Sequence, residues 1–222
     1  MKKNKKLMVF DFDGTITLVD TFKLMIIIRT VSSPKYWKSL FFIILNFFKH
    51  RDKLKFRVEL QKTLWNKKVE RKIFFKKIFK NKFFKTLIRN KVLDYCKLAS
   101  KTQSVLFLTA NEKSIVKAFL KIYLDINNKK ISVIGSNFNK DNYKIIKGIE
   151  KLKSLKKYLY KSNFKNKYII YNFFDSNSDL HLTQICDYNI VVGRLNYFRL
   201  KKINPNLIRF NIFLNSVKNF NL

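Results

Sequence analysis

The chain of 222 residues contains little glycine, proline, cysteine or acidic side chain. Four Gly and two Pro are spread along the chain, and no glycine-rich phosphate loop of the P-loop or dinucleotide-binding kind occurs. Cys96 and Cys186 are too few and too widely spaced for a disulfide framework or a zinc site, so we expect two buried, reduced thiols in a cytoplasmic protein. Charged residues interrupt every apolar stretch before it reaches the roughly 18 residues of a membrane-spanning helix.

Acidic residues number only 14 against 48 Lys and Arg, which gives a formal net charge of +34. Such a charge is typical of proteins that bind nucleic acids or anionic membranes. The basic residues are mostly scattered Lys, however, and Lys, Asn, Ile and Phe are together the residues that A/T-rich codons favour. Arginine, whose planar fork suits phosphate, is scarce, and no nucleic-acid-binding motif occurs. We therefore expect no specific nucleic-acid partner, although a basic nucleic-acid-binding protein remains the alternative from another functional class.

Short apolar runs bounded by polar residues predict buried strands, which alternate with helical patterns. The predicted strands are Leu7–Phe10, Val105–Leu108, Tyr168–Phe174, Tyr188–Val192 and a fifth at Ile131–Ile134. The predicted helices are Glu112–Leu124, Ile149–Tyr160 and Asn177–Cys186. The alternation predicts an α/β fold, with a Rossmann-like parallel sheet and helices on both faces.

Residues 20–95 interrupt this alternation. They carry Lys, Phe, Leu and Ile in a helical rhythm, with one Pro and no Gly. We interpret them as a helical cap inserted after the first strand, so that residues 1–19 and 96–222 form the catalytic core.

The first predicted strand ends in two carboxylates, Asp11 and Asp13, followed by Gly14. Alternate residues that leave a strand point the same way, and ligands of open α/β sheets bind at the carboxyl ends of strands. Two carboxylates so close repel, and a proton or a cation relieves that repulsion. Gly14 permits a sharp turn out of the strand. A solvated turn explains this motif less well.

A second strand end, 160 residues later, carries Asp175 and Asp179 in the run Asp-Ser-Asn-Ser-Asp. Taken alone, the run also suits a helix N-cap. Together with Asp11 and Asp13 it predicts a magnesium site, because hard oxygen ligands with no His or Cys nearby suit Mg²⁺.

Two further motifs are weaker. Thr109 ends the second predicted strand before Asn111 and a helix, where its hydroxyl could bind a phosphate oxygen or cap the helix. Lys151, near the start of another helix, could balance phosphate charge. Lys147 is a rival for that role, because the start of the helix is fixed only to within a few residues.

In this order, the motifs Asp-Phe-Asp-Gly-Thr, Thr109, Gly-Ile-Glu-Lys-Leu and Asp-Ser-Asn-Ser-Asp resemble the haloacid dehalogenase-like superfamily. The resemblance spans residues 7 to 193 and is strongest to the phosphoserine phosphatase and phosphatidylglycerophosphate phosphatase subgroup. It implies a Mg²⁺-dependent phosphate monoester hydrolase that works through an aspartyl-phosphate. A phosphotransferase or phosphomutase using the same site remains an alternative.

The resemblance also implies roles for the site residues. Asp11 would be the nucleophile, and Asp13 the general acid and base. The implied metal set comprises Asp11, Asp13, Asp175 and Asp179, with Asp179 in or just behind the metal shell. The implied phosphate-binding set comprises Gly14, Thr109, Asn111 and Lys151.

The substrate is the least determined property. Arg57 and Glu59 could bind an amino-acid zwitterion such as phosphoserine, or could lie on an ordinary charged helix. Aromatic residues of the insert, including Trp37 and Phe41, are flanked by basic ones, which suits peripheral contact with an anionic membrane as well as a packed helix pair. The sequence therefore leaves a small phosphorylated metabolite and a lipid-linked phosphate both open, with oligomeric state unassigned.

Overall fold

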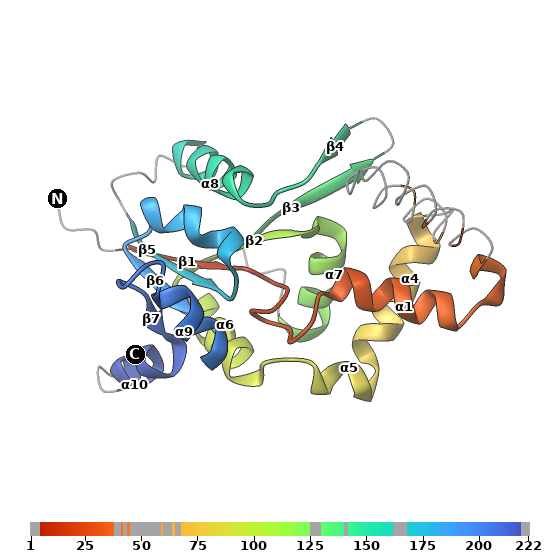
Figure 1. The fold of residues 1–222 in the computed structure, drawn as a ribbon, viewed down its shortest axis with the longest axis horizontal. Helices are drawn as coiled ribbons and strands as arrows, with labels where there is room; N and C mark the ends of the chain where they lie inside the picture. Colours follow the sequence, from red (N-terminus) through yellow and green to blue (C-terminus); the bar gives the residue numbers. More distant parts are fainter. Residues whose placement is uncertain are drawn as a thin grey trace. The chain divides into compact units, whose positions relative to one another are not determined.

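The computed structural model describes residues 5–37, 41, 44, 59, 64, 68–124, 130–139, 142–161 and 168–218. Its chain divides into two compact units, residues 1–19 with 87–222 and residues 20–86 (Figure 1). The elements of the first unit are β1 (Lys5–Phe10), α6 (Asn90–Thr102), β2 (Ser104–Glu112), α7 (Lys113–Tyr123), β3 (Ile131–Asn139), β4 (Asn142–Lys144), α8 (Ile149–Lys161), β5 (Tyr168–Phe174), η2 (Asn177–Gln184), β6 (Tyr188–Val191), α9 (Arg194–Lys201), β7 (Ile208–Arg209) and α10 (Phe210–Lys218).

The strands of the first unit form one sheet in the order β4-β3-β2-β1-β5-β6-β7. All neighbours pair in parallel except β3 and β4, which are antiparallel. The parallel α/β sheet that the sequence predicts is therefore confirmed. Short strands β4 and β7 at its two edges lacked the apolar runs that revealed the others.

Alternate residues of β1 face opposite layers of helices, because side chains of a strand alternate between its faces. Leu7 and Val9 pack in a cluster with Leu152 and Leu155 of α8. On the other face, Phe10 stacks on Phe173 at 4.4 Å between ring centroids. Tyr95 of α6 and Phe213 of α10 contact Phe173 on that same face. Helices thus cover both faces, and a strand buried on both faces reads as a continuous apolar run.

The second unit contains the described helices α1 (Thr21–Val31), η1 (Pro34–Tyr36), α4 (Lys68–Lys80) and α5 (Lys82–Thr86). Arg29 of α1 forms an ion pair with Glu70 of α4 and donates to Tyr36 Oη at 2.8 Å. These contacts join three helices of the unit. Helix is the only regular secondary structure in its described part, as the rhythm of the sequence predicts.

The insert ends at Thr86, whereas the sequence predicts an end at residue 95. The difference is the start of α6, which belongs to the first unit. That helix buries Val92, Tyr95 and Cys96, and Tyr95 lies against Phe10 of the sheet. Both cysteines are free and buried, as predicted.

The helix predicted over Asn177–Cys186 is present, as a 3₁₀ helix. Residues 177–184 form the 3₁₀ helix η2, whose backbone bonds span three residues, as in the bond from Asp179 N to Ser176 O. Ser and Asn at its start favour local hydrogen bonds that compete with an α-helix. No helix in the described ranges combines the length and apolar character needed to cross a membrane.

The aromatic stretch of the insert and Arg57 fall largely outside the described residues. Two aromatic residues of this stretch, Trp37 and Phe41, are described, and their side chains are exposed. Trp37 Nε1 donates to Thr30 O.

Candidate functional site

The candidate site lies at the carboxyl end of the sheet, where the direction of strand order reverses. β1 lies between β2 and β5, so the chain moves outward on either side of it. Such a reversal leaves a crevice beyond the strand ends. Asp11 follows β1 and Asp175 follows β5, and the backbone N–H of Asp11 donates to Phe173 O at 3.0 Å. This arrangement brings together residues far apart in the sequence.

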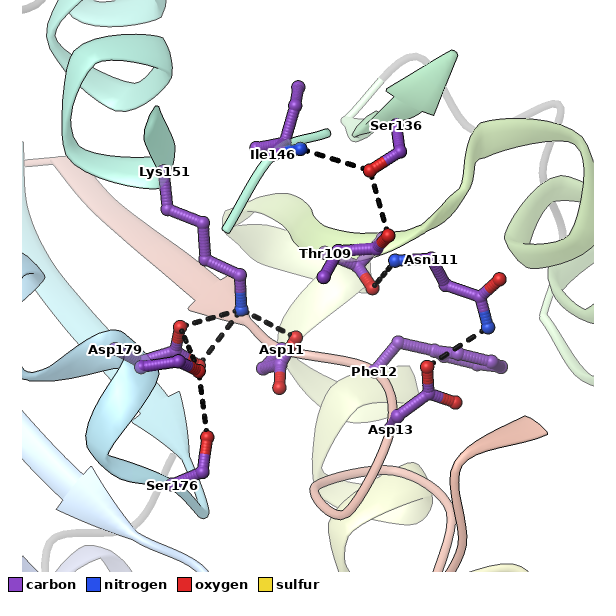
Figure 2. A network of polar contacts seen from close by, with 12 residues as sticks. Asp11, Phe12, Asp13, Thr109, Asn111, Ser136, Ile146, Lys151, Ser176 and Asp179 are labelled. Carbon is purple, nitrogen blue, oxygen red and sulfur yellow. Dashed lines mark hydrogen bonds and ion pairs between the residues drawn. The ribbon is translucent and has the colours of Figure 1, made fainter. Parts of the chain in front are cut away.

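A buried lysine joins two of the aspartates (Figure 2). Lys151 Nζ lies 2.7 Å from Asp11 Oδ1. It also lies 2.7 Å from Asp179 Oδ1 and 2.9 Å from Asp179 Oδ2. Lys151 is 1% exposed and Asp179 is fully buried. Because both carboxylate oxygens of Asp179 contact the ammonium group, Asp179 fixes the position of the Lys151 side chain.

Helix α8 directs Lys151 inward. Leu152, Leu155 and Leu159 anchor the helix in the core beside the sheet. Lys151 is therefore on the first turn of a fixed helix, and its side chain extends to the end of β1 (Figure 2). Lys147 precedes the helix and is exposed, so the structure brings Lys151 and not Lys147 to Asp11.

Asn111 reaches the second carboxylate of the first motif. Its Nδ2 donates to Asp13 Oδ2 at 2.9 Å, and its backbone N–H donates to Thr109 Oγ1 at 3.0 Å (Figure 2). Thr109 and Asn111 are both almost fully buried. Helix α7 begins only at Lys113, so Thr109 does not cap it. Asn111 thus contacts Asp13 in this structure, and its binding of phosphate stays a prediction.

Gly14 makes room for Asp175. Gly14 has a φ of +78°, and a Cβ built there would lie 2.0 Å from Asp175 Oδ2. A side chain at this position would be strained and would displace the carboxylate. Gly14 thus lets Asp175 approach the Asp11–Asp13 loop, and its binding of phosphate stays a prediction.

Burial and mutual repulsion shift the acidities of the site. Burial raises the pKa of Asp11 to about 7, with Lys151 opposing the shift and Asp179 adding to it. Burial, followed by the charge of Asp11, raises the pKa of Asp175 to about 6. Burial opposes the charged form of Lys151, but Asp11 and Asp179 together raise its pKa above the ordinary value. Burial and the neighbouring carboxylates therefore disfavour the charged forms of Asp11 and Asp175, and the nearby cations offset this only in part.

Carboxylates whose charged forms are disfavoured in this way fit a magnesium ion, which would stabilise those charged forms. Among the described residues, no three His, Cys, Asp or Glu side chains gather closely enough to hold a metal by themselves. Mg²⁺ does not need three such side chains, because it commonly uses one or two carboxylates and keeps several waters as ligands. Asp11 and Asp175, each with a raised pKa in the absence of a cation, form such a pair. Both carboxylate oxygens of Asp179 instead contact Lys151.

Sequence reasoning missed Arg89, Gly135 and Ser136. Arg89 Nε donates to Gly14 O at 3.1 Å, and its charge acts on Asp175. Ser136 Oγ donates to Ala110 O and accepts from Ile146 N (Figure 2), which fixes the end of β2. Gly135 lies so close to that strand end that a Cβ would meet Asn111 O at 2.9 Å. Arg and Gly are rare in this chain, and that rarity was the signal in the sequence that could have pointed to Arg89 and Gly135.

Comparison with known proteins adds a family match over most of the chain. The sequence model of the haloacid dehalogenase-like hydrolases matches residues 8–184, a range that includes every residue of the candidate site. No curated protein sequence matches this chain.

Several solved structures share the fold. A Bordetella pertussis protein of unknown function is 12% identical, with a TM-score of 0.67 over 92% of this chain and 98% of its own. A phosphoserine phosphohydrolase-like protein from Francisella tularensis is 17% identical, with a TM-score of 0.56 over 96% and 99%. A haloacid dehalogenase-like hydrolase from Streptococcus pneumoniae is 12% identical, with a TM-score of 0.55 over 97% and 98%. At these identities the likeness shows the fold.

Proposed function

Because this chain belongs to the haloacid dehalogenase-like hydrolases, we propose that it hydrolyses phosphate monoesters with Asp11 as the nucleophile. The observation that carries the proposal is the buried contact of 2.7 Å between Lys151 Nζ and Asp11 Oδ1. The ammonium group orients Asp11 and keeps positive charge close to where a phosphoryl group would approach.

The reaction would proceed in two displacements at phosphorus. The Asp11 carboxylate attacks, the bond to the leaving oxygen breaks, and Asp13 gives that oxygen a proton. Water then attacks the aspartyl-phosphate and gives a proton to Asp13, which releases inorganic phosphate and restores Asp11. Asn111, 2.9 Å from Asp13, holds the acid in one orientation for both transfers. Thr109 Oγ1 accepts from Asn111 N, so its hydroxyl proton can be donated to a phosphoryl oxygen.

Mg²⁺ is the cofactor that the donor set favours. Asp11 and Asp175 would hold it, together with the backbone carbonyl of Asp13. When bound, the ion supplies positive charge against the repulsion between the carboxylates and an anionic substrate. Gly14 and Arg89 serve this arrangement from the protein side, because the first leaves space for Asp175 and the second balances part of its charge.

The substrate class remains a small phosphorylated metabolite, such as phosphoserine, or a lipid-linked phosphate. The resemblance to the phosphoserine phosphatase and phosphatidylglycerophosphate phosphatase subgroup supports both. The Francisella protein that shares the fold is described as phosphoserine phosphohydrolase-like, which makes phosphoserine a reasonable first member of a substrate panel.

Phosphate release from an aryl phosphate tests the mechanism, measured with Mg²⁺ and with EDTA. We expect wild-type release to require Mg²⁺ and Asp11→Asn to lower it by about a thousandfold or more. Asp94→Asn is the matched control, because Asp94 is on the exposed side of α6 with 68% of its side chain accessible. Circular dichroism of each variant verifies folding. Activity of Asp11→Asn equal to that of Asp94→Asn would exclude Asp11 as the nucleophile.

A further inference from the structure

A pocket of about 370 Å³ lies in the first unit where α6, α9 and α10 begin. Its polar lining includes four cationic side chains, Arg89, Lys91, Arg194 and Arg209, and two amides, Asn90 and Asn211. No acidic residue lines it. Among the described residues, Lys91 and Arg209 have no carboxylate partner. The pocket is therefore a concentration of positive charge without internal compensation.

The cationic side chains of the pocket are mostly Arg, although Arg is rare in this chain. Lys and Arg together number 48, and only eight of them are Arg. Four basic residues drawn at random would include fewer than one Arg on average, yet the pocket contains three. A codon bias toward Lys explains the scattered surface charge but not this enrichment. Guanidinium groups present a planar set of donors that matches carboxylate and phosphate oxygens, which scattered Lys does not.

The backbone around the pocket adds to the positive potential. α6, α9 and α10 each contribute first-turn residues to the lining, and helix N-termini carry partial positive charge. Arg89, the N-cap residue of α6, forms no side-chain capping hydrogen bond, and Gly193, the N-cap residue of α9, has no side chain that could form one. The first-turn N–H groups of these helices are thus not capped by their own N-cap side chains.

The pocket lies at the same edge of the sheet as the aspartates. Gly193 follows β6, and Arg209 ends β7, and both strands run parallel to β1 and β5. Arg89 links the two places. Its Nε donates to Gly14 O in the loop of Asp11 and Asp13, while its Nη2 lies 3.6 Å from where a Cβ of Gly193 would be. Arg89 therefore both contacts the catalytic loop and lines the pocket.

We propose that this pocket binds a second anionic group, a carboxylate or a phosphate, of the substrate whose phosphate ester is cleaved at Asp11. The inference rests on the proposed function for its link to a substrate, but the pocket's affinity for anions can be measured independently of catalysis. Arg194 and Arg209 contact the anion, and Arg89 places it relative to the catalytic loop. The preferred substrate thus carries two anionic groups, of which only one is hydrolysed.

The first test is binding of inorganic phosphate, measured by calorimetry in EDTA. Without a cation the catalytic carboxylates repel phosphate, so binding reports mainly on the pocket. We expect the double variant Arg194→Gln/Arg209→Gln to weaken binding by about tenfold or more, the amount that loss of charge-assisted bonds would produce. Arg199→Gln, on an exposed part of α9 away from the lining, is the control and should bind as the wild type does. Equal affinity in the double variant, or no binding by the wild type, would overturn the anion site.

The second test compares hydrolysis of phenyl phosphate with that of its 3- and 4-carboxyl derivatives. We expect wild type and Arg199→Gln to prefer a carboxylated ester in kcat/KM, and the double variant to lose about tenfold or more of that preference. If phosphate binding is lost but the preference is unchanged, the pocket binds anions that are not part of the substrate, and the proposal is wrong on that point. If the wild type hydrolyses none of the esters, the proposed function fails and the substrate assignment with it. The phosphate titration still decides whether the pocket is an anion site.

Discussion

Gly14 and Asp175 occupy adjoining space at the ends of two neighbouring strands, and a Cβ on Gly14 would lie 2.0 Å from Asp175 Oδ2. The hydrogen atom of the glycine is what allows the carboxylate to lie beside the loop that carries Asp11 and Asp13. Spacing in the sequence does not reveal this contact, because it joins residues from two separate motifs. It follows that a substitution at Gly14 should act on Asp175.

Gly14→Ala should therefore lower activity far more than a comparable change elsewhere. Gly148→Ala is the matched comparison, because Gly148 also has a positive φ, of +57°, but a Cβ there would meet nothing closer than 3.9 Å. Both variants should lose about 1 kcal/mol of stability from backbone strain. We expect only Gly14→Ala to weaken Mg²⁺ binding and to reduce kcat/KM by about a hundredfold. Similar kinetic losses in the two variants would show that strain alone is responsible.

Lys151→Met should strongly destabilise the fold. The change leaves the carboxylates of Asp11 and Asp179 buried without their cation, which typically costs about 3–5 kcal/mol in the free energy of unfolding. Lys153→Met provides the control, because 66% of that side chain is exposed, and it should change stability by no more than about 0.5 kcal/mol.

Urea denaturation in EDTA measures both variants, and a third variant identifies the source of the loss. Adding Asp179→Asn to Lys151→Met removes one of the stranded charges and should recover part of the stability. A loss in Lys151→Met no larger than that in Lys153→Met would contradict the buried ion pairs as a source of stability.

Asp175→Asn should stabilise the metal-free protein above neutral pH. The pKa of Asp175 is raised from 3.8 to about 6 in the folded protein, mainly by burial and the charge of Asp11. The folded state therefore binds a proton that the unfolded state has already lost, so this contribution to stability is complete below pH 3.8 and disappears as pH rises through about 6. At pH 8 in EDTA the Asn variant should be more stable than the wild type by about 1–2 kcal/mol, allowing for solvent screening.

The measurement is thermal unfolding between pH 4 and 8, with EDTA and with Mg²⁺. The advantage of Asp175→Asn should grow with pH in EDTA and reverse in Mg²⁺, because only the wild type gains stability from binding the ion. A difference between the two proteins that is independent of pH would argue against a raised pKa at Asp175. Equal stabilisation of both by Mg²⁺ would remove Asp175 from the metal site.

Thr15→Val should increase stability. Thr15 is fully buried, and its Oγ1 is the buried side-chain atom that lacks a hydrogen-bond partner among the described residues. Valine has nearly the same shape without the unsatisfied hydroxyl, so we expect a gain of about 1 kcal/mol in urea denaturation. Thr21→Val is a useful comparison, because Thr21 is equally buried but does have an interaction partner, and its replacement should not stabilise.

The residues that define the chemistry are apparent from the sequence. Asp11 and Asp175 each follow an apolar run, and such runs mark strands that are buried on both faces. Parallel strands end at a common edge, so the sequence alone is enough to expect the two aspartates to meet there. The fold class is predictable for the same reason, since local hydrophobic patterning specifies strands and helices.

The partners of these residues were decided by tertiary structure. Lys151 contacts a carboxylate 140 positions away, and Asn111 contacts one 98 positions away. Local patterning could not separate Lys151 from Lys147, because the choice depends on how α8 is rotated against the core by its leucines. Nor could it predict the contact of Asp179 with Lys151 or that of Asn111 with Asp13.

The sequence by itself determined which side chains could perform phosphoryl chemistry and at which strand ends they stand, because hydrophobic periodicity is a local property. Only the tertiary structure decided which basic side chain contacts which carboxylate. It also decided that Asp175 occupies the space where a side chain of residue 14 would be, and that three of the eight arginines line one pocket. Those relationships depend on the packing of helices against the sheet, which brings together residues that are distant in the chain.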